Sequence, residues 1–298
     1  MVPASPGPYR RSTPGALPSR AADNLFWLGR YVERTEGIMR LLRARNVRLA
    51  EAGEAAAPLI AALDPLLESL GAEPEGGVPV GLLDTLGAAI SSAGQVRDRF
   101  SPDAWSALID LEKTARRMAA KVTPGDDAAR ALSALLRKLT GFSGLVHENM
   151  YRFLGWRFLT IGRHHERAMG MAATLATLAD PEAPEGALDL AVEVGDSVMS
   201  HRRRFSLSTS RATVIDLLAL DEMNPRAIRY QLDGLAQQVR LLPGEDDPGR
   251  MSDLGRALLR LHTDLVTERP EDLTTEALWS LRSRIAALSD HLTEAYLR

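Results

Sequence analysis

A nine-residue pattern, G-R-x-x-E-R-x-x-G, occurs twice in this chain and constrains its fold more than any other feature of the sequence. The copies are GRYVERTEG at positions 29–37 and GRHHERAMG at positions 162–170, offset by 133 residues. At about 100° per residue, the shared positions of each copy fall on one face of a helix. A glycine inside a helix costs about 1 kcal/mol relative to alanine, and the usual compensation is close approach of another backbone or of a ligand. The repeat therefore predicts two helices whose matching faces meet.

We expect the charged residues of the two copies to pair across an approximate internal two-fold axis, so that Arg30 reaches Glu166. The same axis brings Arg163 to Glu33. Since each copy brings two arginines and one glutamate, the paired site has a surplus of two positive charges, which needs an anion, another carboxylate or solvent. The alternative is a solvated face with intrahelical ion pairs, each worth a few tenths of a kcal/mol. The candidate binding residues of the repeat are Arg30, Glu33, Arg34, Arg163, Glu166 and Arg167.

Other polar segments are candidates for the same region. They include the start of the first predicted helix, the segment HENMYRFLGWR ahead of the second copy, and the later segments SHRRRF and NPRAIRYQL. Each residue taken alone could instead be a capping asparagine or a surface arginine. The additional candidate binding residues are Asn24, Arg157, Arg203, Asn224 and Arg226.

The rest of the sequence also predicts helices. Aromatic residues make up only 5% of the chain, and no stretch alternates apolar and polar residues as strands do. The segments SPDAW and NPRAI each place a capping residue before a proline suited to a first helical turn. We predict an all-α fold, a single large bundle of roughly ten helices in which an approximate two-fold axis relates two long central helices. The predicted helices span 23–51, 56–70, 80–100 with a break, 102–121, 126–149, 152–178, 186–208, 213–220, 225–242, 250–268 and 274–297.

The domain organisation is expected to be simple. The acidic Gly/Pro loops are too short to be free linkers, so we predict one helical domain over residues 19–298. Residues 1–18 carry five prolines and lack the apolar segment of a signal peptide, which predicts a disordered leader. No run approaches the ~20 apolar residues of a membrane-spanning helix. We therefore predict a cytoplasmic protein that does not insert into membranes.

Composition and motifs argue against several kinds of site. The chain has no cysteine, which excludes thiolate ligands and nucleophiles, and its net charge of -3 disfavours nucleic acid. It has no glycine-rich nucleotide loop and no Glu-x-x-His pair of the kind that di-iron bundles use. The adjacent His164 and His165 project toward the apolar side of their helix, away from Glu166, so we expect satisfied or exposed histidines rather than ligands. We predict no cofactor and no metal.

Four segments of the chain resemble the bacterial alpha-E domain family. They are SRAADNLFWLGRYVERTEGIMRLL, WRFLTIGRHHERA, SHRRRF and LLALDEMNPRAIRYQL, and the resemblance covers nearly the whole chain from about residue 19. It implies an all-helical domain of unknown biochemical activity, in which Glu33 and Glu166 look like the signature glutamates. The family occurs beside, or fused to, ATP-grasp-type carboxylate–amine ligases, transglutaminase-like proteins and sometimes a proteasome-like peptidase. The resemblance thus implies a pathway that makes or handles a peptide-like product.

Three functional hypotheses follow. In the first, an accessory helical protein works with an ATP-grasp-type ligase or a transglutaminase-like protein and binds an anionic or peptide-like group at the duplicated Arg/Glu face. In the second, an enzyme acts on an amide or peptide-like substrate with Glu33 and Glu166 as acid and base, although neighbouring arginines would keep both carboxylates ionised. In the third, the repeat is only an ion-pair clasp that holds two pseudo-symmetric halves together. The sequence identifies no catalytic residue.

Overall fold

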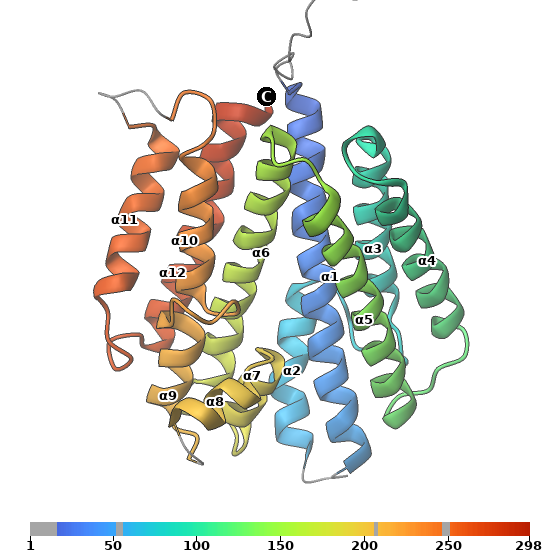
Figure 1. Cartoon of the computed structure of the whole chain (residues 1–298). Coiled ribbons are helices and arrows are strands. Elements are labelled where there is room, and N and C mark those ends of the chain that lie inside the picture. The colour runs from blue at the N-terminus through green and yellow to red at the C-terminus, as the bar shows by residue number, and fades with distance from the viewer. Residues whose placement is uncertain (1–16, 52–55, 206–207, 246–250) are drawn as a thin grey trace, which may run out of the picture.

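The computed structural model describes residues 17–51, 56–205, 208–245 and 251–298. Within these ranges every regular element is a helix, from α1 on the N-terminal side to α12 near the C-terminus (Figure 1). The predicted all-α bundle of roughly ten helices is confirmed. The predicted leader lies almost entirely outside the described residues, and the division into a leader and one domain stays a prediction.

Two long helices form the centre of the bundle. α1 (Ser19–Glu51) and α6 (Leu154–Leu178) lie side by side and run in the same direction (Figure 1). Other helices cover the pair on both sides, so most of α1 is enclosed by neighbours. The flanking helices are α10 (Ile228–Val239) and α12 (Thr275–Leu292) beside α6, and α3 (Val80–Gly94) and α5 (Asp126–Asn149) beside α1.

The remaining helices complete the outside of the bundle. α4 packs against α5, α11 packs against α10 and α12, and α2 and α7 both contact α1 and α6. None of the helices in the described ranges is long and apolar enough to cross a membrane. The bounds are α2 (Ala57–Ser69), α4 (Pro102–Ala119), α7 (Ala187–Val194), α8 (Val198–Phe205), α9 (Arg211–Ile215) and α11 (Asp253–Thr267), with short turns of other helix types at Arg97–Arg99, Asp216–Leu220 and Thr293–Leu297.

Capping residues explain several helix starts. The predicted cap at Ser101 is confirmed, because its hydroxyl accepts a hydrogen bond from the Ala104 amide at 3.2 Å. The predicted start at Asn224 is wrong, since α10 begins only at Ile228. The Asn224 side chain instead donates to the Leu217 carbonyl and forms a turn ahead of the helix. α1 begins four residues earlier than predicted, at Ser19.

The predicted helix 186–208 is interrupted, and the interruption shapes the site. α7 ends at Val194, and Asp196 adopts a left-handed conformation with φ of 52°. The backbone is tight here, because a Cβ on Gly195 would lie 2.8 Å from a methyl group of Leu218. The turn brings the Asp196 carboxylate to 3.1 Å from Arg40 on α1. A continuous helix has no such turn, because a left-handed residue ends the α-helical hydrogen-bond pattern.

Because neighbouring helices enclose α1 on several sides, the polar motif on α1 is buried in the interior of the bundle. Leu25 and Leu28 are fully buried, and burying a leucine contributes about 1.5–3 kcal/mol. Arg30 and Glu33 on the same helix are only 8% and 5% exposed. A charge at such a position needs a partner, because an unpaired buried charge costs several kcal/mol. The bundle therefore holds together only if these charges are matched by others inside it.

Candidate functional site

The first glycine of each motif copy lets α1 and α6 touch through their backbones. A Cβ on Gly29 would come closer than 3.0 Å to the carbonyl oxygen of Leu159. The symmetric Cβ on Gly162 would meet the carbonyl oxygen of Phe26 in the same way. Leu159 and Phe26 are themselves 133 positions apart, the offset of the repeat. The predicted meeting of the two faces across an approximate two-fold axis is therefore present.

The predicted reciprocal ion pairs are also formed. Arg30 Nε donates to Glu166 Oε2 at 2.7 Å. Arg163 Nε donates to Glu33 Oε1, also at 2.7 Å. The solvated-face alternative is wrong for both glutamates, because their side chains are only 2% and 7% exposed. Each pair instead links one central helix to the other.

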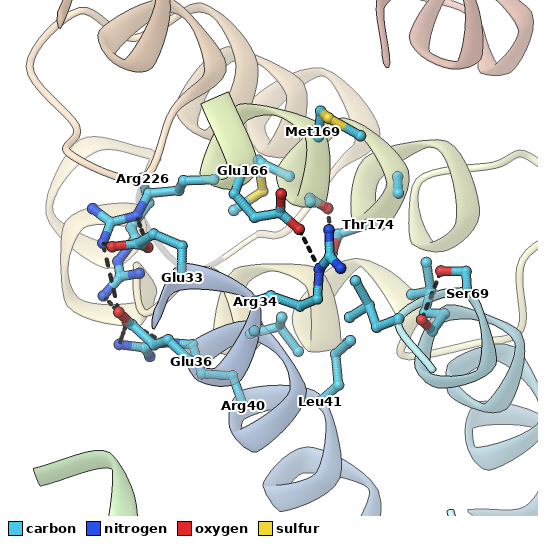
Figure 2. A pocket seen from close by; sticks show the side chains of 18 of the residues that line it. Glu33, Arg34, Glu36, Arg40, Leu41, Ser69, Glu166, Met169, Thr174 and Arg226 are labelled. Carbon is cyan, nitrogen blue, oxygen red and sulfur yellow. Dashed lines mark hydrogen bonds and ion pairs between the residues drawn. The ribbon is translucent and has the colours of Figure 1, made fainter. Parts of the chain in front are cut away.

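A second arginine from each copy completes the cluster. Arg34 Nε donates to Glu166 Oε1 at 2.7 Å, an interaction visible in Figure 2. Arg167 donates to both oxygens of Glu33, at 2.8 and 2.9 Å. Both oxygens of each glutamate thus accept from guanidinium groups of the opposite helix, a strong charge-assisted geometry. We call these six residues the clasp: Arg30, Glu33, Arg34, Arg163, Glu166 and Arg167.

The electrostatics of the clasp favour a charged Glu166. Burial raises the pKa of Glu166, but attraction to Arg30 and Arg34 outweighs burial and holds that pKa below its ordinary value. A general acid or base near neutral pH needs a pKa close to neutrality. A carboxylate whose two oxygens already accept from arginines is well suited to structure or binding and poorly suited to proton transfer.

Glu36 is a third buried carboxylate, which the sequence analysis missed. Arg226 Nη2 lies 2.6 Å from it and Arg40 2.9 Å, while Arg167 lies 3.5 Å away. Burial raises its pKa, yet these cations together lower it to about 2. Its spacing could have revealed it, since it lies three residues after Glu33 and four before Arg40 on the same helix face. Glu36 is another carboxylate of the kind that the surplus of arginines was expected to need, and it neutralises part of that surplus.

Two of the additional candidates lie at this cluster. Arg226 reaches Glu36 from the turn ahead of α10. Asn224 is buried and positions this turn, because its Oδ1 accepts from the Arg226 amide at 3.0 Å and its side-chain amide donates to Ser197 at 3.1 Å. Burial lowers the pKa of Arg226, and repulsion from Arg167 adds to the effect. The arginines here thus outnumber the carboxylates that could neutralise them.

A cavity of about 180 Å³ opens beside the clasp, lined by residues of α1, α2, α6, α7 and α12 and by the turn ahead of α10. Figure 2 shows Arg226, Glu33 and Glu36 on one side of it, Ser69 and Thr174 on the other, and Arg34 between them. Five arginines face three glutamates in the lining, a formal surplus of two positive charges. The charged lining residues are Glu33, Arg34, Glu36, Arg40, Glu166, Arg167, Arg226 and Arg282.

Three candidates lie neither in the clasp, nor in the cluster around Glu36, nor in the lining of the cavity. Asn24 lies inside α1 and donates to the Arg20 carbonyl at 2.7 Å. Arg157 points to Gln238, and Arg203 is exposed on α8. The physical reason is helix phase and length: each lies too far along its helix, or on the wrong helix, to reach the level of the clasp.

The two histidines of the second copy point away from the cavity. His164 shares a hydrogen bond of 2.7 Å with Gln231, as a satisfied histidine would. His165 is 2% exposed and, within the described part of the chain, neither ring nitrogen makes a hydrogen bond of ordinary geometry, so the expectation is wrong for it. Burial lowers the pKa of each histidine to about 4. Across the described ranges no group of three or more His, Asp or Glu side chains is arranged to hold a metal ion.

The clasp contains the dipeptide Glu-Arg twice, at Glu33–Arg34 and Glu166–Arg167. A family model described as a predicted alpha-helical domain with a conserved ER motif, Alpha-E, matches residues 17–297. The chain belongs to the Alpha-E family. The resemblance noted in the sequence is thereby confirmed, and both Glu-Arg pairs of this Alpha-E domain join its two central helices.

Curated relatives extend well beyond this Alpha-E chain. The uncharacterized protein Rv2567 of Mycobacterium tuberculosis (strain ATCC 25618 / H37Rv) is 28% identical over 313 residues, covering 90% of this chain and 34% of that protein. The uncharacterized protein Mb2597 of Mycobacterium bovis (strain ATCC BAA-935 / AF2122/97) matches with the same identity and coverage. The chain thus spans about a third of the length of the curated relatives it matches. No solved structure matches it.

Proposed function

We propose that this Alpha-E domain is an accessory protein that holds an anionic group of a substrate for an ATP-grasp-type carboxylate–amine ligase system. The observation that carries the proposal is the surplus of arginine over glutamate at a cavity next to the clasp. Arginine's planar fork pairs bidentately with carboxylates and phosphates, so an excess of such groups in a concave site favours an anion. In this proposal the protein is cytoplasmic, where ATP is available to the ligase.

The glutamates and the arginines of the site differ in how fully they are paired, and this difference supports binding rather than catalysis. Glu33 and Glu166 are saturated by arginines of the opposite helix, which assigns them to holding α1 and α6 together. Arg226 and Arg282 lie outside that pairing and line the cavity; Arg282 makes no ion pair among the described residues, and Arg226 shares Glu36 with Arg40, which leaves positive charge within reach of a ligand. The enzymatic alternative, with paired glutamates as acid and base, has no support from the lowered pKa of Glu166. The clasp hypothesis accounts for the glutamates but leaves the charged cavity without a role.

The choice of partner rests on the family resemblance. Alpha-E domains occur with ATP-grasp-type ligases and transglutaminase-like proteins, and a carboxylate bound by arginines is the kind of group that such a ligase joins to an amine. A protein that holds such a carboxylate would raise the local concentration, near its partner, of the group that the ligase activates. A transglutaminase-like partner is the second candidate of the same class.

The test measures ADP release by an ATP-grasp-type ligase from the same genome, with and without the purified chain. We expect the chain to increase kcat/KM for the carboxylate substrate. The Arg226→Gln, Arg282→Gln double variant should lose the effect, whereas Arg260→Gln, an exposed change on α11, should retain it. An unchanged rate, together with no binding of the ligase to the immobilised chain, would contradict the proposal.

A further inference from the structure

Resting on the proposed function, we infer that the cavity binds an oxyanion attached to a small aliphatic body, with the body lying against the two open glycines of the repeat. Three features of the cavity carry this inference: an arginine without a carboxylate partner, an apolar wall, and helical glycines that no protein atom approaches. The ligand class is thus a short-chain carboxylate or alkyl phosphate, two sources of one head-group chemistry.

The arginine that lacks a carboxylate is Arg282 on α12. Among the described residues it makes no ion pair, and its guanidinium lies 5.7 Å from the centre of the Trp279 ring. Arg40 pairs with both Glu36 and Asp196, whereas Arg226 has only a share of Glu36, so that carboxylate is divided between cations. A cavity with one unpaired and several partly paired guanidinium groups favours a ligand with negative charge.

The remainder of the lining is apolar. Side chains of α1, α2, α6 and α7 form a wall that leaves room for a group of a few carbon atoms, since a cavity of about 150 Å³ accommodates benzene. An inorganic anion alone would leave this wall in contact with water, whereas an alkyl group would bury it at about 25 cal/mol per Å². The apolar wall consists of Leu41, Leu66, Leu70, Met169, Met171, Ala173 and Val194.

The second glycine of each motif copy gives further support, because both of these glycines, Gly37 and Gly170, line the cavity. Apart from the backbone of its own helix, a Cβ on either would have no described atom within 4 Å. Each glycine costs its helix about 1 kcal/mol relative to alanine, and no backbone contact compensates that cost here. Close approach of a ligand would compensate this cost, because without Cβ atoms the backbone of both helices is accessible from the cavity at these two positions.

The experiment titrates the purified chain with four probes by isothermal calorimetry at constant ionic strength: hexanoate, hexyl phosphate, 1-hexanol and inorganic phosphate. We expect hexanoate or hexyl phosphate to bind about tenfold or more tightly than 1-hexanol and inorganic phosphate, because head group and chain each contribute at least 1.4 kcal/mol. Whichever of the first two binds more tightly identifies the source of the oxyanion, and either supports the inference.

Variants locate the binding in this cavity. Gly37→Ala with Gly170→Ala should weaken hexanoate binding about tenfold while the Tm stays equal or rises, since each methyl enters the cavity and meets no protein atom. The matched control is Gly141→Ala with Gly144→Ala on α5, two glycines that also have nothing within 4 Å but lie outside the cavity. Arg282→Gln should weaken binding without loss of Tm, because it leaves no carboxylate unpaired.

The outcomes separate this inference from the proposed function. If inorganic phosphate binds as tightly as hexanoate and Arg282→Gln weakens both, the aliphatic body is refuted while the anion site of the proposed function stands. If none of the four probes binds, the inference and the anion-holding role both fail. If hexanoate binds equally well to the Gly37→Ala, Gly170→Ala variant, the ligand does not lie against the glycines and the inference is overturned.

Discussion

The two ends of the repeated motif use the same residue for opposite purposes. Gly29 and Gly162 mark the closed end, where α1 and α6 touch so closely that neither glycine has room for a Cβ. Gly37 and Gly170, eight positions later, mark the open end, where no described atom outside the glycine's own helix backbone lies within 4 Å of an added Cβ. The clasp occupies the turns between them. Two parallel helices that cross at one level and separate at the next thus provide both a rigid joint and a hollow.

This difference teaches that a glycine in a helical motif has to be interpreted from its surroundings. At the closed end, helix–helix contact compensates for the low helix propensity of glycine. At the open end the protein itself offers no compensation. Substitutions at the two ends should therefore change stability in opposite directions. Removal of charges between the two ends should have larger effects than either.

Removing one charge of the clasp should have the largest effect. Glu166→Gln leaves Arg30 and Arg34 without their buried partner, so we expect the free energy of unfolding to fall by about 3–5 kcal/mol in urea titrations. Glu112→Gln is the control, because Glu112 pairs with an exposed Arg116 and should cost less than about 1 kcal/mol. Equal losses in the two variants would show that the clasp contributes no more than a surface pair.

Acid should lower the free energy of unfolding, because His165 is buried among apolar side chains near the closed end and is neutral there. The pKa of His165 falls from 6.5 to about 4 on folding, so the unfolded chain binds its proton first and stability is lost as pH falls from about 6.5 to about 4. The shift corresponds to about 3 kcal/mol at 1.36 kcal/mol per pH unit. His164, whose pKa also falls to about 4, should add a loss of similar size in the same window, so in urea titrations His165→Leu should remove about half of the loss that the two histidines cause together.

A separate acid transition should follow at lower pH. Glu36 has a pKa of about 2 in the folded chain against an ordinary value of 4.5, so its contribution is lost as pH falls through that lower window. The variant His165→Leu should leave this second loss in place. A wild-type stability that stays constant between pH 6.5 and 4 would contradict the assignment of a neutral buried histidine.

An alanine at the closed end should separate the helices. In Gly29→Ala the new Cβ meets the Leu159 carbonyl, and the backbone must move, so we expect a loss of about 2 kcal/mol. The symmetric Gly162→Ala should behave alike, because its Cβ meets the equivalent carbonyl of Phe26. Thermal unfolding measures both. A variant as stable as the wild type would mean that the helices do not touch at this level.

An alanine at the open end should have the smallest effect and the opposite sign. Gly37→Ala removes a glycine from α1 without any steric contact, so we expect stability to rise by up to about 1 kcal/mol. Gly87→Ala on α3, where an added Cβ also meets nothing within 4 Å, gives the control gain. A loss of stability at Gly37 alone would indicate that the cavity is narrower than described.

The sequence predicted the symmetric part of the site together with Arg226, and missed Glu36 and Arg282. The contacts from Arg30 to Glu166 and from Arg163 to Glu33 follow from one repeat and one axis, so helical periodicity was sufficient. Arg282 belongs to a distant helix and reaches the cavity only through tertiary packing, which no local pattern encodes. The functional roles of all these residues stay predictions.

Local signals were also misleading where the chain leaves the helix. The segment NPRAI has the composition of a helix start, yet Asn224 is used to hold a turn against Ser197 and Leu217. The tertiary partners of that side chain outweigh its capping preference. The left-handed turn at Asp196 was missed for a similar reason, because close packing at Gly195 is invisible in the sequence.

The departure of the two copies from perfect symmetry has a directional consequence. Where the first copy carries Glu36 and Arg40, the second carries Met169 and Ala173 at the equivalent positions, and all four line the cavity. A hollow on a true two-fold axis would accept a guest in either of two equivalent orientations. Here one wall is ionic and its two-fold-related counterpart is hydrocarbon, so a guest with unlike ends would enter in a single orientation. One end of such a guest would therefore always point in the same direction.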